Sequence, residues 1–470
     1  MYARLIAALL LVVVVPALTL SEQPLTIGDQ LQLLLDDWLI DSMQGVELTL
    51  HSPRPAEVVL PKDKPWEDET MYDPVVLKDG DRYRMWYRTN FNAPPFYTGY
   101  AESADGVQWT KPDLGLIEFQ GSKENNLVWT SGADGAMGYV LSVFKDGNPQ
   151  APDSERYKGF ATRATSQAGE VGILGLISSD GLRWQLLQPD VILRGGAFDS
   201  HNLALWDAAR AQYLAYTRGF RDGVRQIRRA ASGDFRNWSE LTFIDLGDSP
   251  TEHLYKNAAT TYYRQPDILL MFPKRFLPER KADPNWPHPG LSDIVFMSSR
   301  DGIRWQRRFL EAFLRPGLDP LNWHERAIEV GQGLVPTGPG EMSLYYIEHY
   351  RTDSVHIRRG VLREDGFVSV HAPYAGGELV TRPLVFSGDR LVINYATSAA
   401  GSLGVEIQDA DGKPFAGFGF EDAAEIYGDQ TDRVVTWKGG PDVGALAGQP
   451  VRLRFVMKDA DLYSLRFRSE

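Results

Sequence analysis

The chain has 470 residues, no cysteine and a formal net charge of −13 at pH 7. The lack of cysteine excludes disulfides, thiolate metal sites and a cysteine nucleophile. The acidic balance argues against a nucleic-acid partner, because phosphate backbones bind basic surfaces, so we expect a neutral ligand instead.

The first 20 residues have the composition of a secretory signal peptide. An apolar run over residues 5–15 ends at Pro16 and is followed by small residues. This run is shorter than the roughly 20 apolar residues that a membrane span needs. We therefore predict that residues 1–20 are cleaved and that the protein is secreted or periplasmic, with no membrane association afterwards. A buried N-terminal helix is the alternative.

Two β-type runs, 33–40 and 46–50, follow the signal, and four prolines punctuate the next stretch. Prolines interrupt regular structure and mark loops. Residues 21–69 are therefore predicted to form N-terminal strands and a loop.

A short phrase, Ser-x-Asp followed by a Trp, returns four times along the chain. The copies occupy residues 103–109, 178–184, 232–238 and 299–305, and a fifth copy at 363–367 keeps Asp-Gly but lacks the Trp. Asp-Gly provides the positive φ of a tight hairpin, and the Trp can pack between neighbouring sheets. Self-similarity on this scale indicates a repeat architecture. Five copies predict a five-bladed β-propeller over residues 70–368.

An aromatic-rich run precedes each turn and is predicted to be the second strand of its blade. These runs cover residues 83–88, 157–161, 213–218, 268–273 and 343–348. Beyond residue 368 the aromatic repeat stops, and short strands alternate with Gly and Asp turns. Residues 369–470 are therefore predicted to form a β-sandwich, which makes the whole chain all-β.

Three acids stand immediately before the first strands of three predicted blades. They are Asp73, Asp199 and Glu252. First strands line a propeller's central channel, so residues just ahead of them are expected at the channel mouth. A glycosidase needs one ionised and one protonated carboxyl group across the scissile bond. The trio is the predicted catalytic set, although each acid alone fits an ordinary strand start.

With this trio the chain resembles the five-bladed propeller glycosidases of the invertase/fructanase and arabinanase/xylosidase type. Asp73 and Asp199 are 126 residues apart, and Asp199 and Glu252 are 53 residues apart, a wide gap followed by a narrow one. The resemblance implies that Asp73 is the nucleophile or base, Asp199 the stabiliser that binds the sugar ring, and Glu252 the general acid. It also implies a C-terminal β-sandwich. His253 stands where invertases have Cys, and only Asp-Pro of their first motif remains.

Further polar and aromatic residues are candidates for binding the substrate. They are Arg84, Arg88, His201, Asn202, His253, Trp66, Trp86, Glu325 and Glu348. Histidine and arginine donate hydrogen bonds to sugar hydroxyls, and tryptophan stacks on sugar faces. Glu325 heads the fifth blade and is the reserve acid. No metal-binding motif occurs, so we expect no metal and no cofactor, although some arabinanase-type relatives hold an ion in the central channel, and His201 or His324 near the axis leaves that option open.

The sequence supports three functional hypotheses. The leading one is a secreted glycoside hydrolase acting on a neutral oligosaccharide or polysaccharide, and the second is a carbohydrate-binding propeller without catalysis. The third is a scaffold or adhesion protein. Fold alone does not separate them, because propellers serve binding proteins and enzymes alike. The sugar, the linkage and the oligomeric state stay open.

Overall fold

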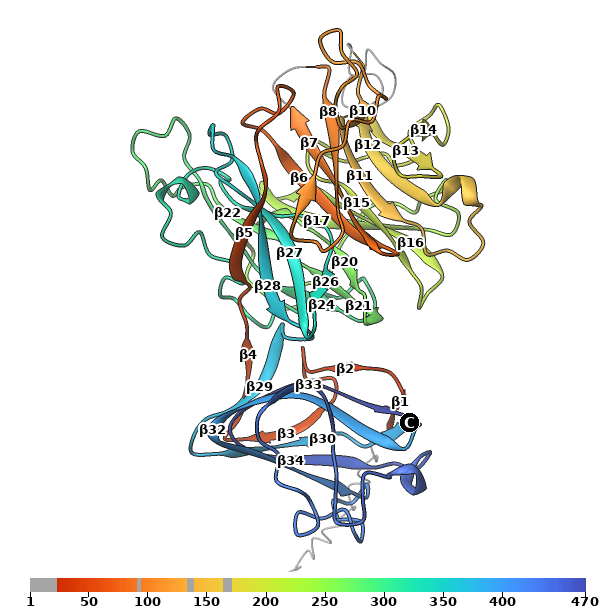
Figure 1. The fold of residues 1–470 in the computed structure, drawn as a ribbon, viewed down its shortest axis with the longest axis vertical. Helices are drawn as coiled ribbons and strands as arrows, with labels where there is room; N and C mark the ends of the chain where they lie inside the picture. Colours follow the sequence, from red (N-terminus) through yellow and green to blue (C-terminus); the bar gives the residue numbers. More distant parts are fainter. Residues whose placement is uncertain (1–22, 91–93, 133–138, 164–170) are drawn as a thin grey trace, which may run out of the picture.

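The computed structural model describes residues 23–90, 94–132, 139–163 and 171–470. The predicted signal peptide lies outside them. The described residues form strands, loops and three short 3-10 helices, with no α-helix among them. Within these ranges, no helix has the length and apolarity to cross a membrane. The chain is therefore all-β, as predicted, and Figure 1 shows a large upper part and a smaller lower part.

The upper part consists of successive antiparallel groups of strands. Blade 1 contains β6 (Tyr72–Asp79), β7 (Arg82–Asn90), β8 (Tyr97–Ser103), β9 (Trp109–Thr110) and β10 (Leu127–Thr130). Blade 2 contains β11 (Tyr139–Lys145), β12 (Tyr157–Arg163), β13 (Gly172–Ser178) and β14 (Gln185–Leu186), with the 3-10 helix η1 (Asp153–Glu155) between β11 and β12. Blade 3 contains β15 (Leu203–Asp207), β16 (Gln212–Arg221), β17 (Val224–Ser232) and β18 (Thr242–Phe243).

The next group is divided into two three-stranded sheets. One contains β19 (His253–Lys256), β22 (Lys274–Leu277) and β23 (Leu291–Ile294), and the other β20 (Thr260–Tyr262), β21 (Gln265–Met271) and β24 (Met297–Ser299). Backbone hydrogen bonds cross the break, from Phe272 to Asn257 (3.0 Å) and from Val295 to Pro273 (2.9 Å). We interpret the two sheets as one blade, blade 4, interrupted at Pro273, which has no N–H to donate.

Blade 5 combines strands from both ends of the propeller sequence. It contains β25 (Glu329–Val330), β26 (Val335–Gly338), β27 (Glu341–Glu348), β28 (His356–Arg363) and β5 (Arg54–Pro61), with the 3-10 helix η3 (Pro320–Asn322) ahead of it. The N-terminal strand β5 pairs antiparallel with β28. On this interpretation the propeller has five blades, and the pairing of an early strand with a late one closes the ring.

The Asp turns join neighbouring blades at the rim. In the first turn, Ser103 Oγ accepts the Gly106 N–H at 2.9 Å, and Asp105 Oδ1 accepts two backbone N–H groups at 2.8 Å. The Gly106 carbonyl accepts a hydrogen bond from the Tyr345 hydroxyl of blade 5 at 2.6 Å. Equivalent bonds run from Trp86 to Gly181 (2.8 Å) and from Tyr216 to Gly302 (2.9 Å). The repeated Ser-x-Asp motif thus links neighbouring blades.

The third turn has Phe235 where the other three have glycine. Its φ of 64° lies in the left-handed region, which is unfavourable for a bulky side chain. The Phe235 ring stacks on Phe160 of blade 2 with centroids 5.5 Å apart. Packing between blades therefore offsets the backbone strain at this turn.

The lower part combines the first strands of the chain with the last. Its main sheet contains β2 (Gln32–Leu33), β3 (Ile40–Gln44), β4 (Glu47–Leu50), β29 (Val368–Ala372), β30 (Gly377–Thr381), β32 (Arg390–Gln408), β33 (Asp429–Val434) and β34 (Arg452–Arg468). A parallel pair of β1 (Leu25–Gly28) and β31 (Leu384–Phe386) and the 3-10 helix η4 (Gly444–Leu446) complete it. The N-terminal strands β1–β4 thus pair with C-terminal strands, and β5 enters the propeller.

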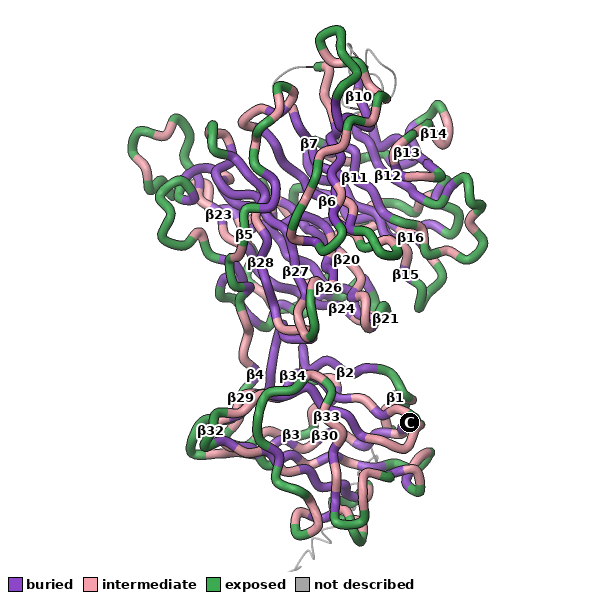
Figure 2. The backbone as a smooth tube through the Cα atoms, viewed as in Figure 1, coloured by how far each residue is buried: buried purple, intermediate pink, exposed green. Residues whose placement is uncertain are grey.

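The two parts share one hydrophobic core and a polar junction. Phe367 stacks on Phe296 of blade 4 at 5.7 Å. The fifth Asp turn lies between them, where buried Asp365 accepts hydrogen bonds from the Tyr262 hydroxyl (2.6 Å), Arg264 Nη1 (2.7 Å) and the Ser464 hydroxyl (2.6 Å). Figure 2 shows the buried strands on both sides of this junction. The fifth turn, which lacks the tryptophan, thus forms a contact between the two parts.

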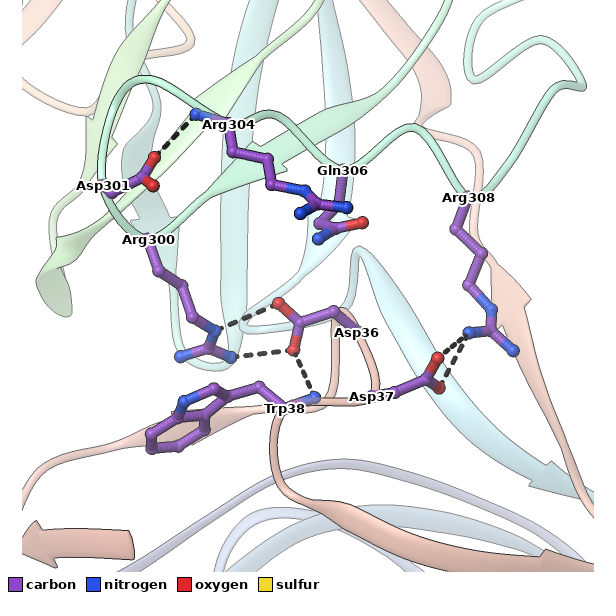
Figure 3. Close-up of a pocket in the computed structure, with 8 residues that line it drawn as sticks. All are labelled: Asp36, Asp37, Trp38, Arg300, Asp301, Arg304, Gln306 and Arg308. Atoms are coloured by element: carbon purple, nitrogen blue, oxygen red, sulfur yellow. Dashed lines mark hydrogen bonds and ion pairs between the residues drawn. The ribbon is translucent and has the colours of Figure 1, made fainter. Parts of the chain in front are cut away.

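A second junction joins the N-terminal segment to the turn of blade 4, as Figure 3 shows. Arg300 donates to the Asp36 carboxylate at 3.0 and 3.1 Å and lies over the Trp38 ring at 4.4 Å. Arg308 donates to Asp37. These ion pairs are partly exposed, so each contributes only about 0–1 kcal/mol.

We expect Asp365→Ala to destabilise the protein strongly. The substitution removes the acceptor of the hydrogen bonds from Tyr262, Arg264 and Ser464 and leaves buried Tyr262 and half-buried Arg264 with fewer partners, a loss of about 3–5 kcal/mol in the free energy of unfolding. Urea denaturation monitored by tryptophan fluorescence measures it. Asp411→Ala, at an exposed turn of the lower part, is the control and should change stability by less than about 0.5 kcal/mol. Equal effects of the two substitutions would contradict the assigned role of Asp365.

Candidate functional site

The candidate site lies where the inner strands of the blades begin. Asp73, at the start of β6, has a φ of 53° and is only 2% exposed. Its neighbour Pro74 is held by blade 5, because the Gln332 N–H donates to the Pro74 carbonyl at 2.9 Å. A Cβ at Gly331 would lie 2.2 Å from that carbonyl, so only glycine permits this approach. Strained backbone at a non-glycine residue often marks a functional position.

Three basic side chains surround the Asp73 carboxylate. Lys256 Nζ forms an ion pair with Oδ1, Arg88 Nη1 lies 3.1 Å from Oδ2, and His201 Nδ1 lies 3.6 Å from Oδ1. Burial alone would raise the pKa of Asp73, but Lys256 and Arg88 hold it well below its usual range. Asp73 is therefore ionised at neutral pH, as a nucleophile or base must be.

The ion pairs continue to a second buried acid, Glu329 of β25. Lys256 Nζ lies 2.9 Å from Glu329 Oε1, and Lys274 Nζ lies 2.8 Å from Oε2. Lys274 also donates to the Tyr72 hydroxyl. Burial lowers the pKa of Lys274 to about 7, although Glu329 opposes the change. Blades 1, 4 and 5 thus meet in a chain of charges inside the protein.

The same residues include a possible donor set for a cation. One ligand atom each of Asp73, His201 and Glu329 lies within 4.8 Å of the others. The Lys256 ammonium already contacts both carboxylates. The Lys256 ammonium therefore already balances carboxylate charge that a metal ion would otherwise balance. The expectation of no metal stays a prediction, which elemental analysis would test.

Asp199 lies beside a different group of residues. Its side chain is 62% exposed and forms an ion pair with Arg218. Arg218 lies over the Tyr255 ring, 5.2 Å from its centroid, and Lys274 Nζ lies 5.3 Å from the same centroid. Asp199 is therefore connected to the buried charges through Arg218 and Tyr255, without a direct bond to Asp73 among the contacts of the described residues.

Glu252 has both carboxylate oxygens engaged by arginine. Arg307 donates to Oε2, and Arg275 Nη1 lies 3.4 Å from Oε1. Glu252 precedes β19, and four residues along an extended strand separate it from Lys256 by about 13 Å. Glu252 is therefore away from the Asp73 ion pairs, and both its place at the mouth and its role as the acid stay predictions.

The two reserve acids are also paired. Glu325 lies 2.5 Å from Arg326 Nη2 and 3.1 Å from Arg351 Nη1. Glu348 accepts hydrogen bonds from Asn322 (2.9 Å), Arg358 (2.5 Å) and His356 (3.0 Å). Burial would raise the pKa of Glu348, but His356 and Arg358 lower it to about 2.

Several predicted binding residues have structural contacts instead. Trp86 is fully buried and donates to Gly181, so it has no face for a sugar, and Arg84 donates to the Asp180 carbonyl at the rim at 2.6 Å. Asn202 donates to backbone carbonyls at 2.8 Å. Trp66 is half-buried and donates to Asn126 at 2.8 Å. His253 contacts Arg225, close to Tyr255.

Sequence reasoning missed Lys256, Glu329, Tyr255 and Arg225, and it gave Lys274 only as a secondary candidate near the funnel mouth. The available signal was weak: Lys256 and Lys274 are lysines at the ends of strand-like runs in the same blade. Lysine is almost never fully buried unless it is paired, so a lysine within an apolar strand implies an acidic partner.

No protein-family model matches the chain. A stretch of 123 residues is 28% identical to the uncharacterized protein MT1551 of Mycobacterium tuberculosis (strain CDC 1551 / Oshkosh), covering 25% of this chain and 34% of that protein. A stretch of 55 residues is 42% identical to the uncharacterized protein Rv1502 of the strain ATCC 25618 / H37Rv, covering 10% and 18%. The matches thus span about a third or less of these relatives.

Similar solved structures include carbohydrate-active enzymes. An N-acetylgalactosamine deacetylase from F. plautii, in complex with blood group B trisaccharide, has a TM-score of 0.46 at 16% identity, covering 68% of this chain and 96% of that one. A glycosyl hydrolase from Bacteroides ovatus has a TM-score of 0.43 at 13% identity, covering 70% and 95%. With TM-scores this low, the function has to be argued from the site itself.

We expect His201 to make the protein sensitive to acid. Burial lowers its pKa from 6.5 to about 4, although Asp73 opposes the change. The folded state therefore binds fewer protons than the unfolded state between pH 4 and 6.5, and stability falls as the pH falls through this window, by about 3 kcal/mol. His201→Gln should make the loss of stability between pH 7 and pH 4.5 smaller. Urea unfolding at both pH values measures it.

The control is His371→Gln, which changes a half-exposed histidine of the lower part. It should leave the pH dependence as in the wild type. If both substitutions give the same pH dependence, buried neutral His201 is not the cause.

Proposed function

We propose that the protein is a carbohydrate-active propeller that hydrolyses glycosidic bonds at the channel mouth, with Asp73 as its ionised carboxylate. The observation that carries the proposal is Asp73 itself. It is a buried acid in a left-handed backbone conformation, kept ionised by Lys256 and Arg88, at the meeting point of the blades. Perturbed titratable groups gathered in this way favour a functional site over a purely structural one.

The proposed roles follow the chemistry of two carboxyl groups. Asp73 is the nucleophile or base, Asp199 binds the sugar ring, and Glu252 is the first candidate for the general acid, with Glu325 as the second. Asp199 and Glu252 are both partly exposed, which suits groups that contact a ligand. Glu252 would have to leave Arg307 or Arg275 when substrate binds, because an acid needs a proton on an oxygen that those arginines now occupy.

One observation favours the second candidate function, carbohydrate binding without catalysis. Both oxygens of Asp73 and both oxygens of Glu252 are engaged by basic side chains. Carboxylates held in this way position neighbouring groups well but attack or protonate poorly. A glycan would then contact the arginine and tyrosine side chains around them.

Substitution of the acids separates the two functions. On a glycan panel, Asp73→Asn and Glu252→Gln should each lower kcat by about 10²–10⁴ with a smaller effect on binding, because each keeps the shape but removes the base or the proton donor. Product analysis by chromatography and affinity by calorimetry measure the two effects. Asp411→Asn, at an exposed turn, is the control and should behave as the wild type.

Two outcomes are informative. Wild-type turnover in both variants would refute these roles and direct the test to Glu325→Gln. Binding of a glycan that is never cleaved would favour the non-catalytic function. Because Asp73→Asn removes the buried charge that pairs with Lys256 and Arg88, its thermal unfolding curve must show that it folds before its activity is compared.

We also propose that the protein is exported, on the basis of its apolar N-terminal segment. N-terminal sequencing of the mature protein from culture medium or periplasm should begin near residue 20. An intact Met1 on protein from the cytoplasm would contradict the proposal.

A further inference from the structure

Four basic side chains surround the ring of Tyr255, a half-buried residue of β19. Their charged groups lie over the ring centroid at 4.8 Å for Arg225, 5.2 Å for Arg218, 5.3 Å for Lys274 and 6.0 Å for Arg326. They come from blade 3, blade 4 and the segment before blade 5. One aromatic ring is therefore the centre of a cluster of positive charge, which we call the Tyr255 cluster.

The acids near this cluster do not balance its charge. Glu325 is shared by Arg326 and Arg351, Glu329 is shared by Lys256 and Lys274, and Asp73 is shared by Lys256 and Arg88. Asp199 pairs with Arg218. The cationic side chains therefore outnumber the carboxylates. The excess contrasts with a whole-chain charge of −13.

Arg225 contributes most directly to this excess of positive charge. Among the residues that the structure describes, no carboxylate lies within ion-pair distance of its guanidinium, and its Nε is buried without a hydrogen-bond partner. Burial lowers the pKa of Arg225, and the nearby charges of Arg218 and Arg326 lower it further, while Tyr255 and Asp199 oppose the change. An arginine among other arginines, with no acid of its own, is unfavourable unless an anion joins it.

Neighbouring residues fix the position of this guanidinium. His253 Nδ1 lies 3.4 Å from Arg225 Nη1 and also accepts the backbone N–H of Arg225 at 3.3 Å. The guanidinium also lies over the Phe276 ring at 5.4 Å. Arg225 is only partly buried, and Asp199 and Phe220 beside the cluster are exposed. The cluster is thus both ordered and accessible to a ligand.

We propose that the Tyr255 cluster binds an oxyanion carried by the substrate, the carboxylate of a uronic-acid sugar. This proposal rests on the proposed function and specifies its substrate class. A planar guanidinium such as Arg225 donates two parallel hydrogen bonds to a carboxylate, and Arg218 and Arg326 add positive charge on either side. The exposed apolar ring of Phe220 offers a contact for the sugar face.

The test compares acidic glycans with their neutral counterparts. Oligosaccharides that contain glucuronate or galacturonate, and the same oligosaccharides after reduction of the carboxyl groups, are titrated into the full-length protein by calorimetry. The acidic forms should bind at least about tenfold more tightly, and this preference should weaken as salt rises from 50 to 500 mM, because added ions screen charge pairs. Inorganic phosphate is titrated separately.

Arg225→Gln is the decisive variant. It removes the charge, keeps hydrogen-bonding ability and leaves the buried ion pairs around Asp73 intact, so it should abolish most of the preference for acidic glycans while retaining binding of the neutral ones. Arg308→Gln, which removes an exposed arginine charge next to Asp37, is the control and should keep the preference. Arg225→Lys should restore part of it.

The outcomes distinguish this proposal from the proposed function. Equal affinity for acidic and reduced glycans, or a preference that Arg225→Gln does not change, would overturn the uronate proposal and leave carbohydrate activity standing. Binding of inorganic phosphate with no preference for uronates would also overturn it, because the anion would then be free rather than part of a sugar. No binding of any glycan would overturn both.

Discussion

The buried chain of charges from Asp73 through Lys256 and Glu329 to Lys274 is the constraint on which the rest of the structure depends. Ions taken out of water cost several kcal/mol each unless they are paired, and removal of one partner leaves the others uncompensated. The members come from β6, β19, β22 and β25, which the sequence separates widely. Charge balance is therefore reached only when blades 1, 4 and 5 have closed into a ring.

Closure of the ring is secured by the Asp turns at the rim. Hydrogen bonds from Trp86, Tyr216 and Tyr345 to the glycine carbonyls of the Asp turns hold neighbouring blades at fixed separations. A rigid rim permits strain at the mouth, because the surrounding contacts determine the position of Asp73 more strongly than its own backbone preference does. The same turn, repeated once more as Asp365, attaches the lower part.

Local patterns predicted the scaffold well and the site only in part. Asp-Gly turns and alternating aromatic strands act over a few residues, so the all-β fold and the rim position of the turns could be inferred from sequence. Asp73 was found because an Asp-Pro pair precedes an apolar strand. Lys256 was not found, because its partner Asp73 is 183 residues away and nothing local reports that contact. The position of Glu252 before β19 predicts a place at the mouth, but it gives no sign of the pairing with Arg307.

If the ligand carries the carboxylate that we propose, its charge is a case in which a property of the whole chain misleads. A net charge of −13 favours a neutral ligand when the protein is treated as one object. At physiological ionic strength, however, charges are screened beyond about 8 Å, so a ligand at the channel mouth interacts mainly with the residues that touch it. Those residues include Arg218, Arg225 and Arg326. Acidic residues elsewhere on the surface therefore leave the Tyr255 cluster available for the anion that we propose.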